Sequence, residues 1–123
     1  MKLLLAIGAG SFLGGIVRYL LSAFVQARFL YAFPYGTMVV NLAGCFLIGV
    51  VYALTDRGSL GEEWRLFLAT GVLGGFTTFS AFSHETIAML RDGQAINAMA
   101  YVALSVVIGL LATYLGISLI KIF

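Results

Sequence analysis

The chain has 123 residues, of which 62% are hydrophobic and only 10% are charged, and its mean hydropathy is +1.07. Soluble globular domains carry about 25% charged residues, so this composition excludes an ordinary soluble protein and indicates an integral membrane protein embedded in the lipid bilayer. The formal net charge of +2 comes from scattered basic residues, so we expect no nucleic-acid partner.

Four apolar segments follow one another along the chain. A spanning helix needs about 20 mostly apolar residues, because the hydrocarbon core is roughly 30 Å thick and a helix rises about 1.5 Å per residue. We therefore predict an all-α membrane protein with four transmembrane helices, built as one four-helix domain over residues 1–123. The predicted helices cover about residues 3–24, 35–54, 63–90 and 95–120.

The segments between these helices carry markers of the membrane surface. Tyr31 and Phe33 in the first linker indicate an interfacial aromatic belt. Pro34 suits the first turn of the second helix, where its missing N–H would have no partner in any case. Ser59 followed by Glu62 predicts a capping box that opens the third helix.

Four spans place both termini and the middle loop on one side of the membrane. Four basic residues lie on that side and two on the other, which gives only a weak bias under the rule that basic loops stay cytoplasmic. We therefore expect the chain to insert in both orientations. The four are Lys2, Arg57, Arg65 and Lys121, and the two are Arg28 and Arg91.

Two polar stripes are predicted to point into the bundle. Thr37 and Asn41 lie four residues apart in the second helix, so they share a face. Tyr101 and Ser105 have the same spacing in the fourth helix. Polar groups at membrane depth usually face a bundle interior, a water-filled cavity or a partner. The alternative for each of them is a purely structural hydrogen bond to a neighbouring helix.

Arg18 is the one formal charge well inside the first helix. Either its long side chain snorkels to the interface, or it creates a positive field that attracts anions at the mouth of a vestibule. The first two helices contain no carboxylate, which removes the obvious means of binding an organic cation or coupling to protons there.

The third helix contains the segment "GVLGGFTTFSAFSHET", residues 71–86, which is rich in glycine and threonine. Both residue types are poor helix formers, so we predict a break in mid-membrane near Gly75. Irregular backbone at membrane depth is tolerated where it is buried in protein or lines a cavity, and its freed carbonyls can bind a cation. A break without any ligand is the alternative.

Phe79 and Phe82 follow this break three residues apart, on one helix face and among hydroxyl side chains. The edge of an aromatic ring is the positive part of its quadrupole. Two such edges would stabilise a small anion where a charged side chain would hold it too tightly. A purely lipid-facing or core role is the ordinary alternative for a phenylalanine.

His84 and Glu85 end the segment, and they either reach interfacial water or pair with Arg91. One histidine and one glutamate are too few ligands for a metal site. No nucleophile, base and orienting group occur together, so we predict that the protein is not an enzyme.

Three motifs resemble the Fluc family of bacterial fluoride channels: "GGIVRY", "GTMVVNLAGCFLIG" and "GGFTTFSAFSHET". Their order and spacing extend over essentially the whole chain, and the third motif is the most specific. The resemblance implies a fluoride-selective channel of the cell inner membrane that exports cytoplasmic fluoride by passive conduction and relieves fluoride toxicity. It also implies an antiparallel, dual-topology homodimer with two pores.

The resemblance further implies roles for individual residues. Gly74 and Thr77 of both subunits would offer backbone carbonyls to a structural Na⁺ at the dimer centre. Gly109 occupies the next step of the fourth-helix polar track, where some relatives have serine. By the family pattern the fluoride pathway would include Asn41, Phe79, Phe82, Tyr101 and Ser105. To these we add Arg18, Thr78 and Ser80 as expected pathway residues.

The alternative function is a small proton-coupled multidrug transporter, which also has about four short helices and often dual topology. Such a protein would need a membrane-embedded glutamate in its first helix, where this chain has Arg18. An accessory subunit of a larger complex would explain the many glycines, but it would leave Asn41 and the phenylalanine pair without a role.

Overall fold

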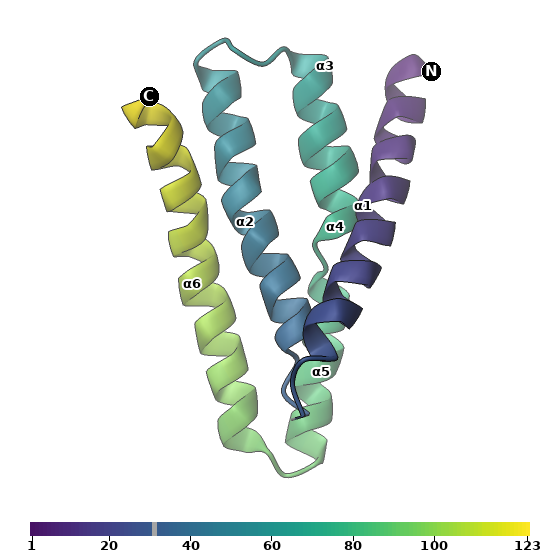
Figure 1. The fold of residues 1–123 in the computed structure, drawn as a ribbon, viewed down its shortest axis with the longest axis vertical. Helices are drawn as coiled ribbons and strands as arrows, with labels where there is room; N and C mark the ends of the chain where they lie inside the picture. Colours follow the sequence, from purple (N-terminus) through teal and green to yellow (C-terminus); the bar gives the residue numbers. More distant parts are fainter. Residues whose placement is uncertain (31) are drawn as a thin grey trace.

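The computed structural model describes residues 1–30 and 32–123, so Tyr31 of the predicted aromatic belt lies outside the described residues. Every described element is a helix (Figure 1). In chain order they are α1 (Lys2–Gln26), α2 (Tyr35–Asp56), α3 (Glu62–Arg65), the π-helical segment η1 (Leu66–Leu73), α4 (Gly74–Phe76), α5 (Phe79–Arg91) and α6 (Ala95–Ile122).

These elements form four helices long and apolar enough to cross a membrane, because α3, η1, α4 and α5 together make the third span, Glu62–Arg91. Their ends lie within two residues of the predicted ends. The chain is therefore a multi-pass membrane protein.

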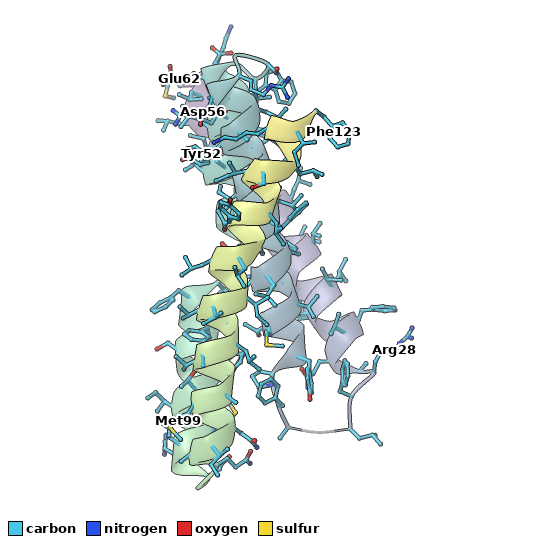
Figure 2. The ribbon with its side chains drawn as sticks, turned by 90° about the vertical axis from the view of Figure 1, so that its left-hand side faces the viewer. Arg28, Tyr52, Asp56, Glu62, Met99 and Phe123 are labelled. Carbon is cyan, nitrogen blue, oxygen red and sulfur yellow. The ribbon has the colours of Figure 1, made fainter. Side chains whose placement is uncertain are left out.

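Both termini and the α2–α3 connection lie at one end of the molecule, and the α5–α6 connection lies at the other (Figure 1). Asp56, Glu62 and Phe123 lie toward the first end, whereas Arg28 and Met99 lie in the opposite half (Figure 2). This arrangement agrees with the prediction that both termini share one side of the membrane.

In the bundle α2 packs against α6, and α1 packs along η1 and α4. Small residues let α1 come close to the third span. A Cβ added at Gly14 would overlap the Val72 carbonyl oxygen, and one added at Gly75 would overlap the Ser11 carbonyl oxygen. Close backbone contact of this kind is how helices associate where no hydrophobic effect drives them together.

The third span is interrupted at Thr77 and Thr78 rather than at the glycines. Gly74 and Gly75 are helical residues of α4, whereas Thr77 (φ −86°, ψ 156°) and Thr78 (φ −148°, ψ 119°) are extended. The predicted break in the third span is therefore present, and it lies two to three residues beyond Gly75. Gly75 lies close against the Ser11 backbone of α1, and β-branched threonine accepts extended backbone readily.

The predicted capping box at the start of the third span is also wrong. Gly61 is the N-cap of α3 and makes no side-chain cap bond. Ser59 lies in the preceding turn, where its backbone N–H donates to the Leu54 carbonyl at 3.0 Å. Glu62 and Glu63 lie in the first turn of α3, where carboxylates interact favourably with the helix dipole.

Candidate functional site

One side chain of α2 binds the break in the third span. The Thr78 N–H donates to Asn41 Oδ1 at 2.8 Å, and Asn41 Nδ2 donates back to the Thr78 carbonyl at 2.9 Å. Thr78 is also the N-cap of α5, and its Oγ1 accepts from the Ala81 N–H at 3.2 Å. Side chains thus replace the helical hydrogen bonds that the break removes, as the membrane interior requires.

The same bonds draw two amides away from their helical acceptors. In a continuous helix the Thr78 N–H would donate to the Gly74 carbonyl, and the Ala81 N–H would donate to the Thr77 carbonyl. Here they bond Asn41 and the Thr78 side chain instead. A Cβ at Gly74 would meet only the Ala69 carbonyl oxygen, at 3.7 Å, so the space beside this exposed residue is open. Carbonyls of this kind suit a hard cation such as Na⁺.

The described residues contain no group of three His, Cys, Asp or Glu side chains that could hold a metal ion. The oxygens available to a cation beside the break are therefore backbone carbonyls and the hydroxyls of Thr77, Thr78 and Ser80. Two carbonyls of one chain are too few to enclose a cation, so a site at Gly74 and Thr77 requires oxygens from elsewhere.

A hollow of about 370 Å³ lies against one face of the break, and we call it the ring hollow. The Phe79 and Phe82 rings face it with centroids 5.6 Å apart and planes inclined by 41°. Ser105 Oγ is buried and has no hydrogen-bond partner among the described residues. None of the described side chains that line this hollow carries a charge. Its polar and aromatic lining includes Asn41, Gly74, Thr77, Phe79, Phe82 and Ser105.

A second hollow, of about 750 Å³, lies against α1, and we call it the vestibule hollow. Arg18 and Ser80, both predicted site residues, line it together with His84 and Glu85. Thr78 lines both hollows, so the break is the wall that they share.

Glu85 of α5 joins the two predicted polar stripes. Thr37 Oγ1 donates to Glu85 Oε1 at 2.6 Å, and Tyr101 Oη donates to Glu85 Oε2 at 2.7 Å. Thr37 and Tyr101 are both buried, which agrees with their predicted inward direction. Glu85 is therefore bonded inside the bundle rather than paired with Arg91. Sequence reasoning missed this role, although two inward hydroxyls signalled the need for an acceptor and Glu85 is the one carboxylate of α5.

The two polar residues of the predicted fourth-helix stripe, Tyr101 and Ser105, do not line the same cavity. Tyr101 Oη bonds Glu85, whereas Ser105 lines the ring hollow. The Tyr101 ring packs against Phe82, with centroids 5.0 Å apart, and against Phe33, with centroids 5.5 Å apart. Tyr101, which was predicted as a pathway residue, is therefore fully buried and lines neither hollow.

Comparison with known proteins gives consistent matches over almost the whole chain. Residues 5–117 match the family of CrcB-like proteins, described as Camphor Resistance (CrcB). A protein of Leptospira interrogans named fluoride-specific ion channel FluC is 47% identical over 99% of this chain and 97% of its own length. A protein of Shewanella amazonensis with the same name is 41% identical over 98% of this chain and 97% of its own length. Another, from Thermus thermophilus, is 47% identical over 91% of this chain and 88% of its own length.

The two bonds between Asn41 and Thr78 predict a strong effect of substitution. Asn41→Ala leaves a backbone N–H and a carbonyl unpaired inside the bundle, where each such group costs about 1–3 kcal/mol. We expect the free energy of unfolding in detergent, followed by the fluorescence of Trp64, to fall by about 2–6 kcal/mol. Asn97→Ala is the control, because the Asn97 bond to Gln94 is exposed and its loss should cost under about 0.5 kcal/mol. Equal stability of the two variants would contradict a structural role for the Asn41 bonds.

Proposed function

The chain belongs to the CrcB-like family, and from this premise we propose that it is a fluoride-specific ion channel of the cell inner membrane that lets fluoride leave the cytoplasm by passive conduction. The observation that carries the proposal is the ring hollow, in which two phenylalanine rings lie beside a break held by Asn41. Conduction of this kind involves no chemical turnover and would relieve fluoride toxicity.

The two hollows suggest the route. Arg18 and Ser80 would draw the anion into the vestibule hollow, and Thr78 would bring it past the break. In the ring hollow the anion would meet positive ring edges rather than a fixed charge, so it would be held weakly enough to leave again.

Hydrogen-bond donors in the ring hollow would replace part of the hydration shell of fluoride. Asn41 Nδ2 carries two hydrogens, and its bond to the Thr78 carbonyl uses one of them. The Ser105 hydroxyl has no partner among the described residues and would donate to the ion. These two groups support Asn41 and Ser105 as pathway residues, while Tyr101 would act through Glu85.

The pathway would be completed by a second copy in an antiparallel, dual-topology homodimer. The Phe79 side chain is 80% exposed in a single chain, and Gly74 is exposed beside it, so this face is open to a partner. Two carbonyls from each copy, at Gly74 and Thr77, would hold a structural Na⁺. The ion would supply a central positive charge that fixes the two breaks against each other. The weak charge bias of the loops favours insertion in both orientations, and a C-terminal reporter seen on one side of the membrane only would exclude the antiparallel pair.

No observation favours the alternative of a proton-coupled multidrug transporter. Glu85 is the one carboxylate of α5, and both of its oxygens accept hydrogen bonds, from Thr37 and Tyr101. The ring hollow offers no carboxylate to an organic cation.

The rings can be tested by substitutions that preserve their bulk. Phe79→Ile and Phe82→Ile keep an apolar side chain but remove the positive ring edge. If the rings contact fluoride, efflux from proteoliposomes should fall at least about tenfold, which corresponds to about 1.4 kcal/mol of lost stabilisation. If the rings are only packing groups, each swap should cost roughly 1 kcal/mol of stability and leave efflux nearly unchanged.

Phe67→Ile is the matched control. Phe67 lies in η1 and contacts Trp64 with ring centroids 5.9 Å apart, away from both hollows. It should conduct as the parent does. Parental efflux from both ring variants would show that the phenylalanine pair does not form the pathway.

The proposed sodium site can be tested at Gly74. Within one subunit a Cβ at this position meets no atom closer than 3.7 Å, so Gly74→Leu should insert and fold normally. Between subunits the new side chain would hold the carbonyls apart. We expect the dimer fraction, measured by cross-linking in detergent, to fall several-fold.

Gly15→Leu is the control, because a Cβ at Gly15 meets no atom within 4 Å. It should leave the dimer fraction unchanged. A Gly74→Leu protein that remains dimeric and retains Na⁺ would remove Gly74 from the site.

A further inference from the structure

A chain of aromatic contacts connects the linker between α1 and α2 with the ring hollow. Phe33 of the linker meets the Tyr101 ring edge to face, with centroids 5.5 Å apart and planes inclined by 80°. The same tyrosine ring contacts Phe82, with centroids 5.0 Å apart and planes inclined by 48°. Phe82 in turn pairs with Phe79 in the ring hollow. Phe33 lines neither hollow, so the proposed pathway gives it no role.

The backbone of Phe33 is fixed by the helices on either side of the linker. The Phe33 carbonyl accepts two hydrogen bonds, from Gln26 Nε2 of α1 at 3.0 Å and from the Tyr35 N–H of α2 at 2.8 Å. Gln26 Oε1 accepts in turn from the Gly36 N–H, at 3.1 Å, in the first turn of α2. The Phe33 ring therefore projects from a backbone that is bonded to both α1 and α2.

The Tyr101 ring can pass the position of Phe33 on to Phe82. Tyr101 is fully buried, and its hydroxyl donates to Glu85 Oε2 at 2.7 Å. Glu85 lies three residues after Phe82, on the same face of α5. The tyrosine is thus held at its hydroxyl by α5 and at its ring by Phe33. In a close-packed interior a shift of one ring displaces the ring that it touches.

We propose that Phe33 is a positioning residue of the channel: through Tyr101 it holds the Phe82 ring in the orientation in which that ring meets fluoride in the ring hollow. This inference rests on the proposed function. Aromatic pairs favour particular angles between their rings, so the loss of Phe33 would free the Tyr101 ring and allow Phe82 to populate other orientations. Only the part of the population that keeps the original orientation would conduct at the parental rate.

The test measures fluoride efflux from proteoliposomes per reconstituted dimer, after the leak of protein-free vesicles is subtracted. Phe33→Leu keeps an apolar side chain but removes the ring. Efflux should fall by about threefold to tenfold, which is the range that one aromatic pair contact supports. Phe33→Tyr keeps a ring and should conduct at nearly the parental rate. If Phe33→Leu does not fold, Phe33→Met takes its place, because its long side chain fills similar space without a ring.

A double variant separates positioning from a general loss of stability. In Phe82→Ile no ring remains to be positioned, so adding Phe33→Leu to it should reduce efflux no further. If Phe33 acted on the fold as a whole, its effect would instead multiply that of Phe82→Ile. The dimer fraction of each variant, measured by cross-linking in detergent, should equal that of the parent.

Phe29→Leu is the matched control, because Phe29 lies in the same linker but stacks on Tyr35, with centroids 4.2 Å apart. It should conduct as the parent does. The inference is overturned if Phe33→Leu conducts at the parental rate, if Phe33→Tyr is no faster than Phe33→Leu, or if the effects of Phe33→Leu and Phe82→Ile multiply. Absence of fluoride efflux from the parent would instead overturn the proposed function, and the inference with it.

Discussion

A helix that breaks inside a membrane must find new partners for the backbone groups it frees, because the hydrocarbon core contains no water to bind them. In this protein the Asn41 side chain meets that requirement through two hydrogen bonds to the backbone of Thr78. The bonds hold the chain extended at Thr77 and Thr78, and they direct the amides away from the carbonyls of Gly74 and Thr77. The extended backbone that forms the wall between the two hollows is bonded to α2 through this one connection.

In the proposed pathway the break also separates two environments with different tasks. On one side, the vestibule hollow is lined by the Arg18 guanidinium, by hydroxyls and by the Glu85 carboxylate, both oxygens of which already accept hydrogen bonds. The guanidinium and the hydroxyls suit the attraction of an anion from water. On the other side, the ring hollow has uncharged donors and aromatic edges, which suit a brief, weak contact. Glu85, with its bonds from Thr37 and Tyr101, braces α5 between α2 and α6. A channel needs both steps, because an ion must be drawn in and must also leave.

The number of spans and the existence of a break were predictable from local rules, since apolar length and poor helix formers are visible in any short window. The position of the break was not, because the extended backbone at Thr78 is bonded to Asn41, which lies 37 residues away in the sequence. The inward direction of Thr37 and Tyr101 followed from helical spacing. Their common partner, Glu85, did not follow, because it requires the relative rotation of three helices. The sodium site and the dimer remain predictions.

Selectivity for fluoride over chloride is the central property of the proposed channel. The measurement is ion efflux from liposomes that contain the purified protein and are loaded with either potassium fluoride or potassium chloride, with a potassium carrier added to balance the charge. An uncharged, ring-lined hollow that replaces the hydration shell of a small anion predicts rapid fluoride efflux and chloride efflux no faster than from protein-free vesicles. Equal efflux of the two ions would contradict the central claim.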